Sequence, residues 1–382
     1  MQNKILAILL IGLALCQPYF LYGSPEKVTK EIEIGEHAYD APKEIIHHIS
    51  DANEFHIIGE LSMPLPCILY NSDNGKISVF LSSRFHHGEL AIDGYVLDHG
   101  RVKMIQSADF PEGEVPIALQ HEEIHGEEIA FIEMDGKRYK VERAGFMDFS
   151  ISKVVFGLFM AALLMFLIFL TVAKGYKKRE GQAPKGLQSF MEPLIIFVRD
   201  DIAKPNIGEK YEKYLPYLMS IFFFIWFNNM LGLVPFFPFG ANTTGNLMVT
   251  LTLAVFTLLI TNLSANKAYW QHIFWMPGVP VPVKILLAPI ELIAVFTKPF
   301  ALMVRLFANI SAGHIIILSL ISLIFIFGDA GQNLGGGIAG ITIAVPFVLF
   351  MNLLELLVAF LQAFIFTILS ALFIGQAVEE HH

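Results

Sequence analysis

Residues 285–327 read ILLAPIELIAVFTKPFALMVRLFANISAGHIIILSLISLIFIF. As a straight helix these 43 residues would measure ~60 Å, about twice the hydrocarbon thickness of a bilayer. Residues 338–377 form a second apolar stretch of similar length. We expect each stretch to be one strongly tilted transmembrane helix, with Pro289, Pro299 and Pro346 as possible kinks and residues 328–337 as the connecting loop.

Three shorter apolar stretches precede this pair, at residues 154–173, 215–237 and 247–263. Each has the length that a membrane-spanning helix requires. Residues 190–198 are apolar but too short to cross, so we expect an interfacial helix there. The sequence therefore predicts an all-α polytopic membrane domain over residues 151–382, with about five transmembrane helices including two long tilted ones.

The distribution of charge indicates where the chain changes solvent. Only 16% of the residues are charged and 54% are hydrophobic, whereas soluble domains carry about 25% charged residues. Residues 24–150 are the exception, with 35 charged side chains and a net charge of −13. No broad basic face suggests nucleic acid as a partner. The chain combines an acidic water-soluble domain with a membrane domain.

Two signals predict the orientation in the membrane. Residues 1–23 have the charged start and short apolar run of a signal peptide, with cleavage near Gly23. A basic cluster follows the first span, and such clusters stay in the cytoplasm. It comprises Lys174, Lys177, Lys178 and Arg179. We therefore expect a bacterial inner-membrane protein with a periplasmic domain at residues 24–150 and a cytoplasmic carboxyl terminus.

The acidic domain is predicted to be small and mixed α/β or mainly β. Residues 76–81, 89–97 and 129–133 have strand-like patterns between turn signals, and helix is expected only at residues 42–54. After signal cleavage Cys67 is the one cysteine left, so we expect it to be buried and to form no intrachain disulfide.

Few ionisable residues lie within the apolar stretches, and charge at bilayer depth is costly. Glu291, Lys298 and Arg305 are spaced by seven residues and share a stripe of one helix. Glu291 can pair with Lys298 along this stripe, whereas Arg305 has no acid three or four residues away. Arg305 therefore requires a partner on another helix or another chain.

If the two long helices pack antiparallel, residues with a similar index sum lie at a similar depth. This places Arg305 level with Gln362, and His314 level with Glu355 about 13 Å further out. A histidine and a carboxylate at one depth can exchange protons near neutral pH. The alternative is a purely structural salt bridge.

The motifs Arg305-Leu306-Phe307-Ala308-Asn309 and 361–366 (LQAFIF) resemble the signature helices of subunit a of the F-type ATP synthase membrane sector. The resemblance extends from about residue 150 to the carboxyl terminus, and residues 197–200 (FVRD) strengthen it. Glu291 and Lys298 also stand at family-like offsets before the arginine. The acidic domain is an extension that many members of the family lack.

The resemblance implies that Arg305 faces the carboxylate of a rotating c-subunit ring, with Gln362 supporting it and Asn309 lining the same surface. His314 and Glu355 would belong to the outer proton half-channel, in an order that only some members share. The implied partners are the c ring, the peripheral stalk b subunits, the other ATP synthase subunits and the lipid membrane. No cofactor or metal is implied, and ATP chemistry would reside in other subunits, so this chain is not itself an enzyme.

Gly232 departs from the family pattern, because some members carry an aspartate there. Asn228 and Asn229 are expected to offer hydrogen bonds to water in that region instead.

Two other functions are open from the sequence. His121, Glu122 and His125 satisfy the zinc peptidase pattern, which requires a helix, although a following glycine and strand-like residues leave little room for one. A secondary ion-coupled carrier is the second alternative. Many carriers have internal repeats, and this sequence has none that we recognise.

Overall fold

The structure is a computed structural model, and it describes residues 42, 45, 49–58, 61–72, 74–107, 109–124, 127–234, 240, 242–329 and 332–379. The predicted signal peptide lies outside the described residues, as do residues 43, 44 and 46–48 of the helix expected at residues 42–54. The helix expected there is wrong for residues 51–54, which are not helical and lead into a strand that begins at Glu54. Contacts divide the chain into two compact units, which are considered separately. The first comprises residues 1–157, 235–237 and 321–345, which include all of the strands, and the second comprises residues 158–234, 238–320 and 346–382.

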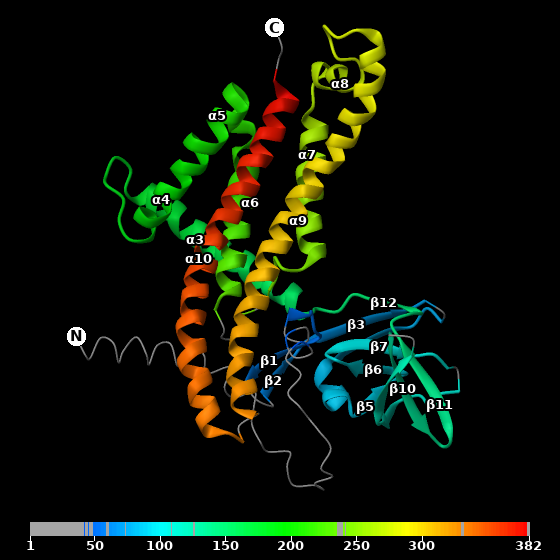
Figure 1. Cartoon of the computed structure of the whole chain (residues 1–382). Helices are drawn as coiled ribbons and strands as arrows, with labels where there is room; N and C mark the ends of the chain where they lie inside the picture. Colours follow the sequence, from blue (N-terminus) through cyan, green and yellow to red (C-terminus); the bar gives the residue numbers. More distant parts are fainter. Residues whose placement is uncertain are drawn as a thin grey trace, which may run out of the picture. The chain divides into compact units, whose positions relative to one another are not determined.

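The amino-terminal part is mainly β, as predicted. A seven-stranded antiparallel sheet has the order β8-β5-β6-β7-β11-β10-β9, a three-stranded sheet has the order β12-β3-β4, and β1 pairs with β2 (Figure 1). The strands are β1 (Glu54–Ile58), β2 (Leu61–Pro64), β3 (Pro66–Asn71), β4 (Ile77–Leu81), β5 (Leu90–Ile92), β6 (Tyr95–Asp98), β7 (Arg101–Ile105), β8 (Glu114–Pro116), β9 (Leu119–Ile124), β10 (Glu127–Met134), β11 (Lys137–Glu142) and β12 (Phe146–Asp148).

The expected strands are present. The expectation that helix occurs only at residues 42–54 was wrong. Residues 89–97 form β5 and β6, which the Asp93-Gly94 turn separates. A 3₁₀ helix at Ser82–Gly88 was not predicted. His86 and His87 within it adopt positive φ, so this short segment lacks the regular geometry that gives a helical pattern in a sequence. Cys67 is fully buried between the sheets, and burial raises the pKa of its thiol to about 12.

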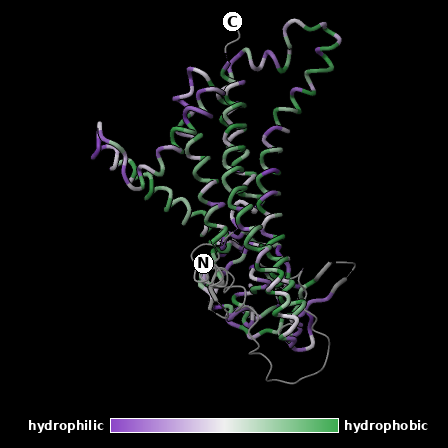
Figure 2. The backbone as a smooth tube through the Cα atoms, turned by 60° about the vertical axis from the view of Figure 1, so that its left-hand side comes forward, coloured by the Kyte–Doolittle hydropathy of each residue, from purple (hydrophilic) through white to green (hydrophobic). Residues whose placement is uncertain are grey.

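The remainder of the described chain is helical. Five helical segments are long and apolar enough to cross a membrane, which agrees with the predicted number. Most residues along the long helices are hydrophobic, with isolated hydrophilic positions (Figure 2). The helices are α3 (Lys153–Lys178), α4 (Leu187–Phe197), α5 (Lys204–Ile207), α6 (Tyr211–Gly232), α7 (Leu247–Ser264), α8 (Lys267–Phe274), α9 (Val281–Phe327) and α10 (Leu334–Val378).

α9 and α10 are each a single unbroken helix, of 47 and 45 residues. They run antiparallel and side by side (Figure 1), as the sequence predicts. The connection between them is shorter than expected, because α10 begins at Leu334 and includes glycines assigned to the loop. A Cβ atom at Gly336 would lie 1.8 Å from the Phe327 carbonyl oxygen. Gly336 is therefore required for the close approach of the two backbones.

The core of the helical unit forms where α6, α9 and α10 meet, with residues from α3 and α4 at its edge. Phe222 and Phe223 of α6 are fully buried, and α10 contributes small residues such as Ala363 and Ala371. Small residues allow helix backbones to approach closely in a membrane, where van der Waals packing replaces the hydrophobic effect. This packing holds the inner faces of α9 and α10 in place.

Gly375 of α10 provides a test of that packing. A Cβ atom there would lie 1.9 Å from the backbone carbonyl oxygen of Asn206 in α5. Relief of this clash requires a shift of one of the two backbones, because no flexible side chain is involved. We expect Gly375→Ala to destabilise the chain by about 1–3 kcal/mol, measured as a lower thermal unfolding midpoint in detergent. The control is Gly335→Ala, because a Cβ atom there meets its nearest neighbour at 3.6 Å. Equal midpoints for the two variants would contradict the close contact.

Candidate functional site

One face of α9 does not pack within the helical unit. Leu302, Leu306 and Ile310 are buried in the core, whereas Arg305 and Asn309 are exposed. Residues four apart lie above one another on a helix, so Arg305 and Asn309 share the outward face. Within the part of the chain that the structure describes, we find no ion pair for the Arg305 guanidinium. A permanent cation in a membrane helix is costly without a partner, so this exposed face of α9 is a candidate binding surface.

Gln362 lies on the inner side of this arrangement. Its exposure is 3%, and its neighbour Ala363 is buried in the core. The sequence placed Gln362 level with Arg305, but the described contacts include no hydrogen bond between the two side chains. The Gln362 side chain is thus buried in the helical unit, whereas the Arg305 side chain is exposed on α9.

The predicted pair of His314 and Glu355 is present. The distance from His314 Nδ1 to Glu355 Oε1 is 3.6 Å, and the two side chains are 18% and 4% exposed. Both carboxylate oxygens of Glu355 are buried without a hydrogen-bond partner among the described groups. A buried carboxylate in that state can accept a proton or bind water, so the geometry allows proton exchange as well as a structural salt bridge.

Gly313 creates the space for this carboxylate. A Cβ atom at Gly313 would lie 2.9 Å from Glu355 Oε1, closer than side-chain atoms approach without a shift. No pattern in the sequence indicates this role for Gly313. Only the position of the facing helix reveals that the absent side chain leaves room for Glu355.

Asn228 and Asn229 of α6 are buried and bound to protein groups. Asn228 Oδ1 accepts a hydrogen bond of 3.0 Å from Thr243 Oγ1, and Asn229 Oδ1 accepts one of 2.6 Å from Thr244 Oγ1. Asn229 Nδ2 also donates to the Ala359 carbonyl of α10 at 3.1 Å. From the sequence we expected these amides to offer hydrogen bonds to water. Instead they attach the segment before α7 to α6, and α6 to α10, near Glu355.

Glu291 and Lys298 are not found as an ion pair among the described contacts. Lys298 Nζ donates a 3.1 Å hydrogen bond to Gln376 Oε1 of α10 and lies 5.6 Å from the centre of the Phe373 ring. Burial, and secondarily the Glu291 carboxylate, raise the pKa of Tyr269 in α8. The two charges therefore interact with α10 and α8 rather than with each other.

The zinc peptidase reading is wrong for the described residues, because His121 and Glu122 lie on strand β9. Consecutive strand residues point to opposite faces, so the helical arrangement of the motif cannot form there. Glu122 forms an ion pair with Arg138 instead. His125 lies outside the described residues.

His121 contributes to a different cluster, around the buried carboxylate of Asp98. Asp98 Oδ1 is 2.9 Å from His121 Nε2 and 3.0 Å from His99 Nδ1, and Asp98 Oδ2 is 2.6 Å from Lys103 Nζ. Burial alone would raise the pKa of Asp98, but hydrogen bonds from these three groups outweigh it and lower the pKa below its usual range. Three donor atoms here are close enough to hold a metal ion. Lys103 already supplies a cation to the carboxylate.

Two family models match separate parts of the chain. One is described as ATP synthase A chain and matches residues 155–375. The other is described as a domain of unknown function (DUF8433) and matches residues 44–145, which contain nearly all of the β strands.

Several named proteins are similar to this chain. ATP synthase subunit a 2 of Chlorobaculum tepidum is 50% identical over 243 residues, which are 62% of this chain and 65% of the relative. ATP synthase subunit a of Chloroherpeton thalassium is 49% identical over 248 residues, with 63% and 71% covered. ATP synthase subunit a of Chlorobium phaeobacteroides strain DSM 266 is 43% identical over 299 residues, with 74% and 83% covered. This last match covers 299 residues, more than residues 151–382 contain, so that similarity includes part of the β region. The chain spans about two thirds of the first of these relatives.

Asn229 tests the polar attachment of α6. In Asn229→Leu the side chain keeps its approximate size, but Thr244 Oγ1 and the Ala359 carbonyl each lose a buried partner. We expect a loss of about 2–4 kcal/mol in unfolding free energy, because both groups remain desolvated. Thermal unfolding in detergent measures it. Asn309→Leu makes the same change at an exposed site and should leave the midpoint unchanged. An equal effect at both positions would contradict the role of Asn229.

Proposed function

The chain belongs to the ATP synthase A chain family, and from this we propose that it is the stator subunit of a proton-translocating F-type ATP synthase. Its partners are the c-subunit ring, the peripheral stalk b subunits and the other subunits of the synthase. It couples proton flow across a bacterial inner membrane to rotation of the ring, and ATP is made by other subunits. The β domain is exported to the periplasm and the carboxyl terminus is cytoplasmic.

The observation that carries this proposal is the outward position of Arg305. The core side of α9 buries Leu302 and Leu306, and the guanidinium is left on the opposite, exposed face. A ring carboxylate that passes this face is attracted to the cation and held deprotonated, because the interaction is strong in a low-dielectric environment. The same cation repels a proton that would otherwise leak directly between the two half-channels. Asn309 lines this surface one turn away, and Gln362 supports it from α10.

His314 and Glu355 supply the outer half-channel in this proposal. A proton entering from the periplasm is taken up by the pair, and it is then released to a ring carboxylate that has moved beyond Arg305. The nine residues from Arg305 to His314 correspond to ~13 Å along α9, which separates the fixed cation from the titratable pair. Glu291 and Lys298, on the other side of Arg305 along the helix, border the inner half-channel. The carrier alternative gains no support, because we find no internal repeat among the described helices that would form a solute site.

Arg305→Ala tests the central step. We expect ATP-driven proton pumping by the assembled complex in vesicles to fall on the order of 100-fold or more, because the ring carboxylate loses its electrostatic partner. Arg179→Ala removes an exposed cation from the loop between α3 and α4 and is the control. Assembly is checked by copurification of the ring with each variant. Tightly coupled pumping by an assembled Arg305→Ala complex would overturn the proposal.

His314 and Glu355 are tested by exchange. The double variant His314→Glu, Glu355→His keeps one titratable base and one titratable acid at the same depth, whereas each single variant leaves two similar groups. We expect the double variant to pump protons faster than either single variant, because the two groups act as a unit. Initial rates of vesicle acidification measure this. If all three variants lose activity equally, the two side chains are not coupled.

A further inference from the structure

The three-stranded sheet of the β domain has apolar side chains on its outer face. Strand residues normally alternate between a buried apolar face and a polar face in contact with water. Here Ile77, Val79 and Leu81 of β4 are 65%, 67% and 48% exposed, and Met147 and Phe149 are 54% and 62% exposed. We call this surface the apolar sheet face. It comprises Pro66, Ile68, Tyr70, Ile77, Val79, Leu81, Met147 and Phe149.

The strand register makes this face continuous. Ile68 stands opposite Val79, and Tyr70 stands opposite both Ile77 and Met147. The Phe149 amide donates to the Ile68 carbonyl at 2.8 Å, so Phe149 extends the same face beyond the end of β12. The intervening residues of β3, Cys67 and Leu69, point into the core instead. None of the eight side chains of the face is charged. Monomeric soluble domains rarely expose so many adjoining apolar side chains.

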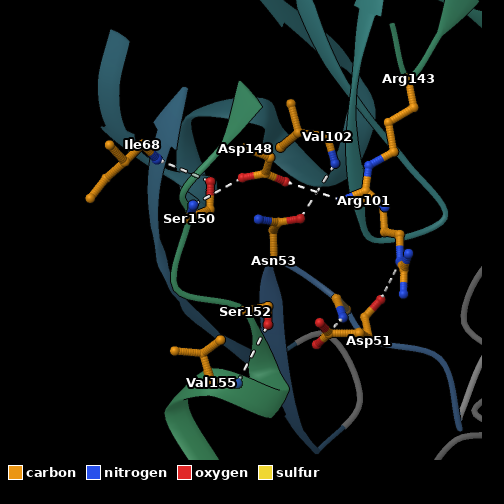
Figure 3. Close-up of polar contacts among 11 residues, drawn as sticks. Asp51, Asn53, Ile68, Arg101, Val102, Arg143, Asp148, Ser150, Ser152 and Val155 are labelled. Carbon is orange, nitrogen blue, oxygen red and sulfur yellow. Dashed lines mark hydrogen bonds and ion pairs between the residues drawn. The ribbon is translucent and has the colours of Figure 1, made fainter. Parts of the chain in front are cut away.

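The sheet is joined to α3 without a flexible linker. After β12 the chain remains paired with β3, because the Ile151 amide donates to the Pro66 carbonyl at 3.0 Å. The Ile68 amide donates to Ser150 Oγ at 3.0 Å, and the Asp148 carboxylate accepts a bond from the Ser150 amide at 2.9 Å (Figure 3). Pairing thus continues to two residues before α3 begins at Lys153.

The first turn of α3 is itself bound by the β domain. Asp51 Oδ1 accepts a hydrogen bond of 3.0 Å from the Val154 amide, and the Lys153 amide donates to the Ala52 carbonyl at 2.7 Å. These bonds satisfy amides at a helix start that would otherwise have no partner. Arg101 Nε donates to the Asp51 carbonyl at 2.9 Å, which fixes that segment to β7 (Figure 3). The domain therefore holds the start of α3 in one orientation.

We infer that the apolar sheet face rests on the lipid of the leaflet through which α3 enters the membrane. The apolar span of α3 begins at Val154, and only four residues separate β12 from α3. Four residues reach at most ~14 Å, so the end of β12 lies within that distance of the start of α3 at the membrane surface. The part of α3 that follows is apolar and exposed as well, with Phe159 and Leu163 64% and 51% exposed. The contact is apolar rather than electrostatic, because the acidic domain offers no attraction to anionic lipid.

Site-directed spin labelling of the full chain in phosphatidylcholine vesicles tests this contact. A nitroxide is attached at Val79→Cys, in a background where Cys16 is replaced by serine. Cys67 is fully buried and its raised pKa keeps the thiol unreactive. The matched control is Glu133→Cys, at an exposed position of β10 in the other sheet. Collision of the label with oxygen, which concentrates in lipid, is compared with collision with a water-soluble nickel chelate.

For Val79→Cys we expect oxygen collisions to exceed nickel collisions by several-fold, with the reverse at Glu133→Cys. The preference should persist in 0.5 M salt at about the same value, since apolar contact is not screened. Ile77→Cys is a second labelling site if Val79→Cys fails to fold. Equal access of nickel to both positions would overturn the proposal. It would also be overturned by a label shielded from both reagents, which indicates a protein partner, or by spin–spin broadening, which indicates a second copy of the chain.

Discussion

A guanidinium cannot remain against hydrocarbon without a partner, and this constraint governs the arrangement of the helical unit. Arg305 therefore needs a face of α9 that the core leaves open, and its side chain is exposed in the structure. α9 meets this requirement by burying Leu302, Leu306 and Ile310, which fixes the rotation of the helix about its axis. The rotation in turn determines the positions of Asn309 and His314. The arginine is thus positioned by the apolar packing of Leu302, Leu306 and Ile310 on the opposite face of the helix.

The same packing produces two different environments for ionisable groups. Arg305 is exposed on the outer face, whereas Glu355 lies between the long helices with both oxygens buried. A small residue is needed wherever the helices approach each other closely, and Gly313 fulfils this need beside Glu355. The two groups thus have different surroundings, with a permanent cation at a surface and a titratable carboxylate in an interior.

The sequence predicted the features that depend on hydrophobic length and period. The number of spans, the single long helices and the pairing of His314 with Glu355 follow from counting residues along antiparallel helices. The choice of hydrogen-bond partners could not be predicted in this way. Lys298 had an acid seven residues away and binds Gln376 instead, and Asn229 binds Thr244 and the Ala359 carbonyl. Such contacts depend on the rotation and separation of helices, which hydrophobic periodicity does not specify.

The junction at Asp51 shows how a local hydrogen bond can have a consequence at long range. A transmembrane helix that follows a flexible linker leaves its attached domain free to turn. In this chain Asp51 caps the first turn of α3, while β3 keeps the preceding residues in strand conformation up to Ile151. Rotation of the domain would break these bonds and expose helix amides at the membrane boundary, where unsatisfied polar groups are costly. The cost of those exposed amides opposes rotation of the domain about the first turn of α3.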